Sequence, residues 1–446
     1  MHPVEAHIRE TIRHEGPIPF SRFMETALFS PFGGYYAAEE AVGARGDYYT
    51  SPTAHPLFGH LIAAQIEQMW VLLGRPDPFT VVEAGAGAGL LARDIVAGCA
   101  ALDPNLARAI RYVALDHVRP PGHDRLPEGA SRLVASGVPL RGIVGCVLSN
   151  ELFDCFPVHR FQMKEGRPME VYVGLVDDEL GEVLDEPSDP EIARRVRAAT
   201  GDGLPEGYRG EVCLGLDPWA AEVAGALSRG FVLSVDYGGV VEELYAPHRA
   251  RGTLRCYYRH TVSGNPYIRV GRQDITAHVD FSELARAGER HGLTTLGHGT
   301  QGEFLRNLGA EFFFEALARR ARRRANEALD RGGQPAHAPQ AQPMDRGEYQ
   351  ANRMAMAWLL DPQGLGGFRV LVQGKGVGEP VPWGFDPDNP HRRSMAERIE
   401  ALETPLRSQA HTPLMEGRYP HAAFEVGREW GLDTGEAAGG APEDGD

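Results

Sequence analysis

The segment from residue 79 to residue 96 constrains the fold most, because it joins an apolar run to a glycine-rich loop and then to a helical pattern. Residues 79–83 predict a short buried strand, residues 83–89 are Glu-Ala-Gly-Ala-Gly-Ala-Gly, and residues 90–96 have the apolar spacing of a helix. A loop between a strand and a helix collects backbone N–H groups and the positive end of the helix dipole. The segment therefore predicts a ligand site at the end of this strand.

Further strands and helices alternate along the chain. Strands are predicted at residues 112–115, 143–149, 231–235 and 368–372. Helices are predicted from Ser51, with Pro52 at the first position, to Gly74, from about Pro218 to Arg229, and after Asp280 with Ser282 as the cap. This alternation indicates an α/β fold with a mostly parallel sheet that helices cover on both faces. Residues 161–163 and 169–176 predict two antiparallel strands added to that sheet.

Composition and charge restrict the class of protein. The 446 residues correspond to about three domain equivalents, and the 42% hydrophobic and 24% charged residues are typical of a folded protein. The net charge of −16 disfavours nucleic acid as a partner, because a negative field repels phosphates. We find no apolar run long enough for a membrane span and no secretory pattern. The five cysteines lack a CxxC pair, which indicates no metal site and a reducing, cytoplasmic location.

The glycine loop favours S-adenosylmethionine (SAM) over a dinucleotide. A dinucleotide fingerprint needs a small residue where Leu90 stands. Glu83, two residues before the first glycine, can hold the SAM ammonium directly or through water, whereas an unpaired buried carboxylate would be costly. Asp116 ends the next strand and can accept hydrogen bonds from ribose hydroxyls. A glycine turn without a ligand, and Asp116 as a simple helix cap, stay open as alternatives.

A second group of polar residues follows the strand that ends at Ser149. In an α/β sheet this position faces the same cleft as the glycine loop. The Asn150 amide oxygen can accept from an amine, and Phe153 can stack on a planar cation. Glu151 and Asp154 supply two carboxylates, which can orient a guanidinium and support its loss of a proton. The alternative is that Asp154 caps a helical turn and Glu151 is solvated.

Several motifs in this order resemble the MidA / complex I assembly factor 7 family. They are Gly46-Asp47-Tyr48-Tyr49-Thr50-Ser51-Pro52, the glycine loop, Asn150-Glu151-Leu152-Phe153-Asp154 with Pro157-Val158, Asp236-Tyr237-Gly238 and residues 274–281. The family consists of class I SAM-dependent methyltransferases, and its mitochondrial members are implicated in methylating an arginine of a respiratory complex I subunit. The sequence departs from the family at Ala86 and Ala88, where proline and arginine are usual, and at Pro120 and Pro121, which should break the helix expected there.

The resemblance implies an architecture and a set of site residues. We expect a Rossmann-like, seven-stranded class I methyltransferase core with a helical N-terminal region and a helical insertion. It implies that SAM is bound near Glu83, Gly85, Gly87, Gly89, Asp116, Asp47, Thr50 and Ser51. It also implies that Asn150, Glu151 and Asp154 are the catalytic residues at the acceptor, with Phe153 and Asn150 binding the substrate.

The expected domains follow from the same comparison of motifs. Residues 1–75 form a helical N-terminal region that closes over the cofactor site. Residues 76–378 form the methyltransferase domain, with a β insertion at about 161–185 and a helical insertion at about 303–360. Residues 379–446 are a C-terminal extension with a disordered acidic tail. The arginine run from Arg319 to Arg324 is predicted as a solvated helix face, with contact to a substrate or partner as the alternative.

These observations predict a SAM-dependent methyltransferase whose acceptor is an arginine side chain of a protein partner. By the family resemblance, that partner could be a respiratory-complex subunit, and a homodimer is compatible with the sequence. Two alternatives stay open: a non-catalytic assembly scaffold that keeps the fold, and a methyltransferase for a small-molecule amine or hydroxyl.

Overall fold

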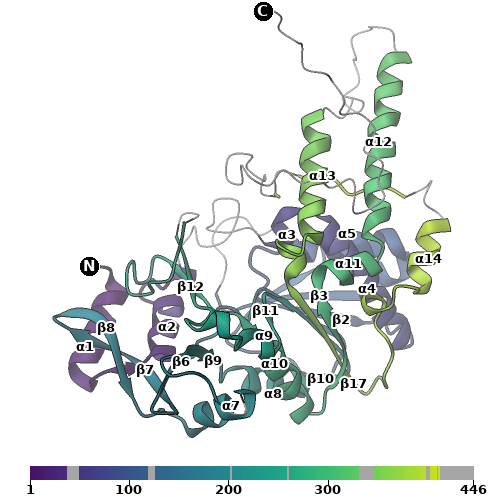
Figure 1. Cartoon of the computed structure of the whole chain (residues 1–446). Helices are drawn as coiled ribbons and strands as arrows, with labels where there is room; N and C mark the ends of the chain where they lie inside the picture. Colours follow the sequence, from purple (N-terminus) through teal and green to yellow (C-terminus); the bar gives the residue numbers. More distant parts are fainter. Residues whose placement is uncertain are drawn as a thin grey trace, which may run out of the picture.

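A seven-stranded mixed sheet forms the centre of the protein (Figure 1). The computed structural model describes residues 1–37, 50–118, 126–200, 203–258, 261–330, 346–397, 402–408 and 410–411. The strands follow the order β16-β17-β10-β5-β2-β3-β4, and β17 runs antiparallel to both of its neighbours. Their bounds are β16 Thr294–Thr300, β17 Arg369–Lys375, β10 Leu227–Asp236, β5 Ile143–Asn150, β2 Phe79–Ala84, β3 Ile110–Asp116 and β4 Ser131–Val134. The α/β class with a mixed sheet is confirmed.

Helices cover both faces of this sheet because its strands are apolar on both sides. Phe79 and Val81 of β2 face one apolar core, and Val82 and Ala84 face the other. The first core is covered by α4 Leu57–Leu72, α5 Leu90–Leu102, α6 Pro104–Ala109, α11 Gln301–Asn307, α12 Ala310–Asp330 and α13 Arg346–Leu360. The second core is covered by α8 Leu216–Ala226 and α10 Phe281–Arg290.

The long helix predicted from Ser51 to Gly74 is wrong, since the structure divides it into α3 Ser51–Ala54 and α4. His55 is extended between them, with φ −159° and ψ 140°. The cause is Pro56, whose ring disfavours a helical conformation of the residue before it. The cap of α3 is Thr50, whose side chain accepts from the Thr53 backbone N–H. Likewise, Asp280 rather than Ser282 caps α10.

The antiparallel strands after residue 158 belong to a second sheet, so their predicted addition to the central sheet is wrong. This sheet contains β1 Ile18–Pro19, β6 His159–Lys164, β7 Arg167–Val176, β8 Glu179–Asp185 and β9 Arg209–Val212. The predicted antiparallel pairing of β6 with β7 is confirmed. Helices α1 Pro3–Glu15 and α2 Phe20–Phe29 contact β7, and α7 Pro190–Thr200 contacts β7 and β9.

Short elements and one α-helical region complete the described chain. The short elements are α9 Val241–Leu244, β11 Gly238–Gly239, β12 Arg255–Tyr258, β13 Thr261–Ser263, β14 Asp274–Thr276, β15 Val279–Asp280 and α14 Pro390–Glu397. Helices α11, α12 and α13 lie between β16 and β17 in sequence, and α12 and α13 rise from the body side by side (Figure 1). Among the described residues, no helix combines the length and apolar character needed to cross a bilayer.

Candidate cofactor and acceptor site

The glycine loop connects β2 to α5 through three glycines with positive φ. These angles are +74° at Gly85, +49° at Gly87 and +81° at Gly89. Residues with a Cβ are strained in this region of backbone space, which explains the choice of glycine. The Gly85 N–H donates to the Leu115 carbonyl of β3 at 2.9 Å, and Gly89 precedes the first turn of α5. The loop is therefore held against the end of the neighbouring strand.

The space beside Gly87 fits a bound ligand. A Cβ built on Gly87 would have no atom of the described residues within 4 Å, whereas a Cβ on Gly85 would meet Leu152 at 3.0 Å and one on Gly89 would meet Leu126 at 2.6 Å. The N-cap of α5 is Gly89, which has no side chain to cap the helix. Its first backbone N–H groups can therefore bind an external acceptor. This loop matches a cofactor cradle better than a tightly filled turn.

Glu83 and Asp116 lie at the same edge of the sheet, as the sequence predicted. Glu83 is 4% exposed, and the Tyr112 hydroxyl donates to its carboxylate at 2.8 Å. Burial raises the pKa of Glu83 to about 8. A cationic ammonium beside it would favour its ionised form. The Asp116 carboxylate accepts from the Gly87 N–H at 2.8 Å, so it supports the loop from the next strand.

The predicted acceptor loop lies directly beside the glycine loop, because Leu152 is the residue that a Cβ on Gly85 would meet. Asn150 ends β5, and the Asn150 amide donates to the Glu151 carboxylate at 3.0 Å. The Asn150 amide oxygen is buried and has no hydrogen-bond partner among the described residues. An orphaned buried acceptor is costly unless a ligand satisfies it. The loop therefore has one unused acceptor close to the glycine loop.

Glu151 has a left-handed backbone, with φ +50°. Its N–H donates to the Val235 carbonyl of β10 at 2.9 Å, which fixes this conformation across the sheet. A non-glycine residue in this region is strained by roughly 1–2 kcal/mol, and such strain is concentrated at functional sites. The Ser51 N–H at the start of α3 donates to the Glu151 carboxylate at 3.3 Å. Ser51 thus lies at the acceptor loop with Thr50 directly before it in the chain, whereas Asp47 lies outside the described residues.

The carboxylates of this loop form a buried acidic cluster. Burial, with the neighbouring Asp154 charge as the second cause, raises the pKa of Glu151 to about 8. Burial raises the pKa of Asp154 to about 6, and it raises the pKa of Asp236 well above its usual value. Within the described part of the chain, no lysine, arginine or histidine forms an ion pair with these three carboxylates. A cationic ligand bound among them would favour their ionised forms.

Phe153 does not face the cleft, and its predicted contact with substrate is not supported by its position. It is 3% exposed and packs edge-on against Trp219, with ring centroids 4.7 Å apart. The Phe153 ring fills the core between the sheet and α8, because the loop turns its apolar side chain inward. No face of this ring is left for a planar substrate.

Two residues were missed as site residues in the sequence. The Tyr237 hydroxyl donates to the Asp154 carboxylate at 2.6 Å. The Asp236 carboxylate accepts from the backbone N–H groups of Leu152 and Phe153 at 3.0 and 2.8 Å, so it holds the acceptor loop in place. Their position at the end of β10 was a usable signal, because β10 lies beside β5 and the carboxyl ends of parallel strands share one edge.

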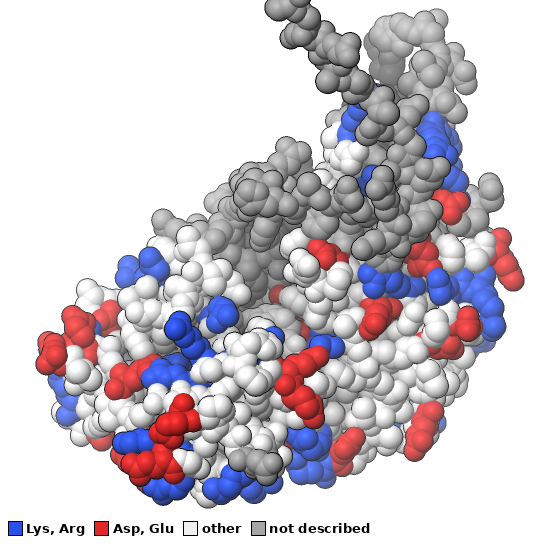
Figure 2. Space-filling model, in the orientation of Figure 1, with Lys and Arg blue, Asp and Glu red and all other residues white. Residues whose placement is uncertain are grey.

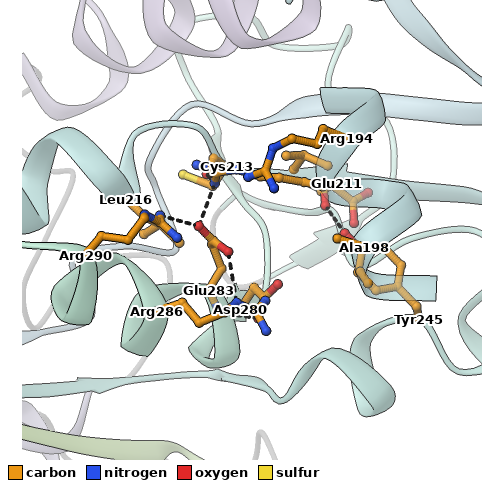
Figure 3. Close-up of a pocket in the computed structure, with 13 residues that line it drawn as sticks. Arg194, Ala198, Glu211, Cys213, Leu216, Tyr245, Asp280, Glu283, Arg286 and Arg290 are labelled. Carbon is orange, nitrogen blue, oxygen red and sulfur yellow. Dashed lines mark hydrogen bonds and ion pairs between the residues drawn. The ribbon is translucent and has the colours of Figure 1, made fainter. Parts of the chain in front are cut away.

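A separate cavity of about 200 Å³ lies between α7, β9, α8 and α10 (Figure 3). Arginines and carboxylates line it together, and one carboxylate, Glu283, pairs with three of the arginines. Glu283 forms ion pairs with Arg290 at 2.7 Å and with Arg195 at 3.4 Å. This network joins α10 to α7, and none of the sequence-predicted site residues lines the cavity.

The mixed sheet, the glycine cradle at the end of β2 and the acidic loop at the end of β5 define a SAM-dependent methyltransferase. A family model described as "Putative S-adenosyl-L-methionine-dependent methyltransferase" matches residues 61–299. The chain belongs to this family, which confirms the resemblance identified from the motifs, and its cofactor is SAM.

Related proteins agree with this assignment. "Protein arginine methyltransferase NDUFAF7 homolog, mitochondrial" from Drosophila melanogaster is 28% identical over 342 residues, which cover 70% of this chain and 76% of the relative. "Protein arginine methyltransferase NDUFAF7, mitochondrial" from Homo sapiens is 28% identical over 346 residues, with 71% and 75% covered. A crystal structure of a COG1565 superfamily member from Burkholderia thailandensis, bound to S-adenosyl-homocysteine, is 28% identical with a TM-score of 0.70. That alignment covers 86% of this chain and 94% of the solved chain.

Proposed function

We propose that this enzyme transfers the methyl group of SAM to an arginine side chain of a protein partner. The observation that carries the proposal is the buried acidic cluster beside the glycine loop, in which Glu151 and Asp154 have no cationic partner among the described residues. A guanidinium satisfies such a site, because it is a permanent cation with five donors. The relatives from Drosophila and human are named protein arginine methyltransferases, which supports the same acceptor.

Each residue of the acceptor loop has a role in this reaction. SAM, when bound, supplies a methyl group on a positively charged sulfur. The Asn150 amide oxygen accepts an N–H of the guanidinium and orients its nitrogen toward the glycine loop. Glu151 and Asp154 neutralise the guanidinium, and Glu151 accepts the proton that the attacking nitrogen loses. Tyr237 holds the Asp154 carboxylate through its 2.6 Å hydrogen bond. Catalysis then depends on positioning and electrostatic support.

The test compares Glu151→Gln with the wild type. We expect turnover to fall by at least about a hundredfold, because the proton acceptor is lost, whereas the affinity for SAM stays within about threefold. Methylated product is measured by mass spectrometry with an arginine peptide as acceptor, and SAM affinity by calorimetric titration. Glu10→Gln is the matched control, since Glu10 is an exposed glutamate on α1.

The outcomes separate the proposal from its alternatives. Methylation of a small amine or hydroxyl with no product on arginine would replace the protein acceptor. A well-folded wild type that binds SAM and methylates neither kind of acceptor would favour the scaffold alternative. Equal turnover by Glu151→Gln and Glu10→Gln would remove Glu151 from the acceptor site.

We also propose that the central sheet is the seven-stranded core of a class I methyltransferase, with the helices between β16 and β17 as an insertion. In this proposal residues 1–75 close over the cofactor site, residues 76–378 form the methyltransferase domain and residues 379–446 form an extension. The hydrogen bond from Ser51 to Glu151 supports a role for the N-terminal region at the site. Limited proteolysis with and without SAM tests it, because closure would protect this region when SAM is bound.

A further inference from the structure

The outer parts of α12 and α13 lie side by side as a hairpin, and among their residues 319–323 and 346–353 only Asn352 is buried. Helix α12 has 21 residues, so it extends about 30 Å. Among the side chains of α12 that the structure describes, residues 310–323, the buried ones such as Phe314 and Leu317 lie in the part nearest the body, and none from Arg319 to Arg323 is buried. Burial therefore does not explain residues 319–323, and a polar helix face that projects from the body is suited to contact another molecule.

Arginines dominate the charge of this hairpin. We call the surface formed by residues 319–323 of α12 and 346–353 of α13 the arginine hairpin. Its arginines are Arg319, Arg320, Arg322, Arg323, Arg346 and Arg353, and its only carboxylate in these ranges is Glu348. Figure 2 shows blue side chains on both helices above a body that carries red and blue groups intermixed. In a chain with a net charge of −16, this concentration of positive charge is local.

The arginine hairpin already binds one carboxylate of the chain itself. Glu403 lies against α12, where its two oxygens pair with Arg323 at 3.0 Å and with Arg320 at 3.4 Å. Arg322 is exposed, and within the described residues it takes part in no ion pair. Two arginines of this surface are therefore spaced so that they bind one carboxylate together, and Arg322 can bind a further carboxylate.

The base of the arginine hairpin is hydrogen-bonded to the acceptor loop through two side chains. The Leu359 carbonyl near the end of α13 accepts from the Gln301 amide at 3.2 Å. The Gln301 amide oxygen accepts from the Ser51 hydroxyl at 3.0 Å, and the Ser51 N–H donates to Glu151 at 3.3 Å. Leu359 lies on the same helix as Arg353, about 9 Å further along it, so a protein that docks on the hairpin and extends along α13 reaches the acceptor loop.

We propose that the arginine hairpin docks an acidic surface of the protein whose arginine is methylated. This inference rests on the proposed function and specifies the substrate class. The enzyme offers buried carboxylates to a cation at the acceptor loop and positive charge on the hairpin, so its substrate has the reverse pattern: an arginine at one point and clustered carboxylates at another. Nucleic acid and anionic membrane fit less well, because they carry no arginine for the carboxylates of the acceptor loop.

The test uses two fluorescent peptides that differ only in charge. Both carry Gly-Arg-Gly and a flexible Gly/Ser linker, followed by eight glutamates in one peptide and eight glutamines in the other. The linker of about 12 residues spans roughly 20 Å on average. Binding is measured by fluorescence anisotropy at low and high salt. Methylation is measured by mass spectrometry with the same peptides.

Two double variants are compared with the wild type. Arg322→Gln with Arg323→Gln removes charge from the arginine hairpin, and Arg13→Gln with Arg167→Gln removes two exposed arginines from α1 and β7. We expect the wild type and the control variant to bind the glutamate peptide about tenfold more tightly than the glutamine peptide at low salt. The hairpin variant loses this preference. The glutamate tail lowers the KM for methylation and leaves kcat unchanged.

The outcomes distinguish failure of this inference from failure of the proposed function. Equal binding of both peptides, or equal losses in the two double variants, would overturn docking even if both peptides are methylated. Hairpin-dependent binding of the glutamate peptide without arginine methylation would support docking and reject the arginine acceptor. Tighter hairpin-dependent binding of a nucleic acid duplex or of phosphatidylserine vesicles than of the glutamate peptide would overturn the assignment to an acidic protein.

Discussion

Replacing Glu83 by Gln should change how stability depends on pH. Burial raises the pKa of Glu83 from 4.5 to about 8, so the folded protein keeps a proton that the unfolded chain releases in this window. Because the folded state binds more protons, its stability falls as the pH rises from about 4.5 to about 8. A shift of this size corresponds to about 5 kcal/mol as an upper limit, and we expect about 2–3 kcal/mol after local relaxation. Gln stays neutral and can still accept from Tyr112, so the variant should avoid this loss.

The assay is urea unfolding of the wild type and Glu83→Gln at about pH 5.5 and about pH 8.5. The difference between the two proteins isolates Glu83, because other buried carboxyls are common to both. Calorimetric titration with SAM in two buffers of different ionisation enthalpy adds a second measurement. If the cofactor ammonium lies beside Glu83, binding near neutral pH releases a proton from it, and the variant releases none there. Parallel pH dependence of the two stabilities would refute the reasoning.

Three further changes test other parts of the site. Gly87→Ala places a methyl group in open space at φ +49°, so we expect a stability loss of only about 1–2 kcal/mol but at least tenfold weaker SAM binding by calorimetry; unchanged affinity would argue against the cradle. Tyr237→Phe removes the hydrogen bond that favours ionised Asp154, so kcat should fall about tenfold. The acidic limb of the pH profile of kcat should move to higher pH, and a loss of kcat that is independent of pH would contradict this role. His411→Phe removes the 3.1 Å partner of buried Asp94, and urea unfolding should reveal a loss of about 1–3 kcal/mol; an unchanged midpoint would contradict it.

The strands of the central sheet could be predicted because their pattern is local. Residues 79–83 and 143–149 are continuous apolar runs, and the observed β2 and β5 each extend one residue further. The second sheet could not be predicted in this way. Its first strand pairs Ile18 with Val173, and no short-range pattern links residues so far apart.

The site was predictable in its position and less so in its contacts. Asn150, Glu151 and Glu83 follow from the rule that strand ends share one edge. The orientation of Phe153 was not predictable, since an aromatic side chain in a loop can face either the core or a ligand. Its contact with Trp219 depends on where α8 packs, which the sequence does not give. The role of Asp236 in holding the acceptor loop was not predictable either, because it depends on hydrogen bonds from residues more than 80 positions earlier in the chain. The cytoplasmic location stays a prediction, and the relatives from Drosophila and human are named as mitochondrial proteins.

The antiparallel pairing of β10 with β17 has a consequence for synthesis of the chain. Asp236 ends β10, and its partner Arg369 emerges about 130 residues later. At roughly 5–20 residues per second, the apolar edge of β10 stays open on the ribosome for roughly 7–25 s. During that interval a neighbouring nascent chain can pair with it. The growing polypeptide therefore depends on chaperones or on low local concentration until β17 arrives, and a product truncated before Arg369 should aggregate instead of folding.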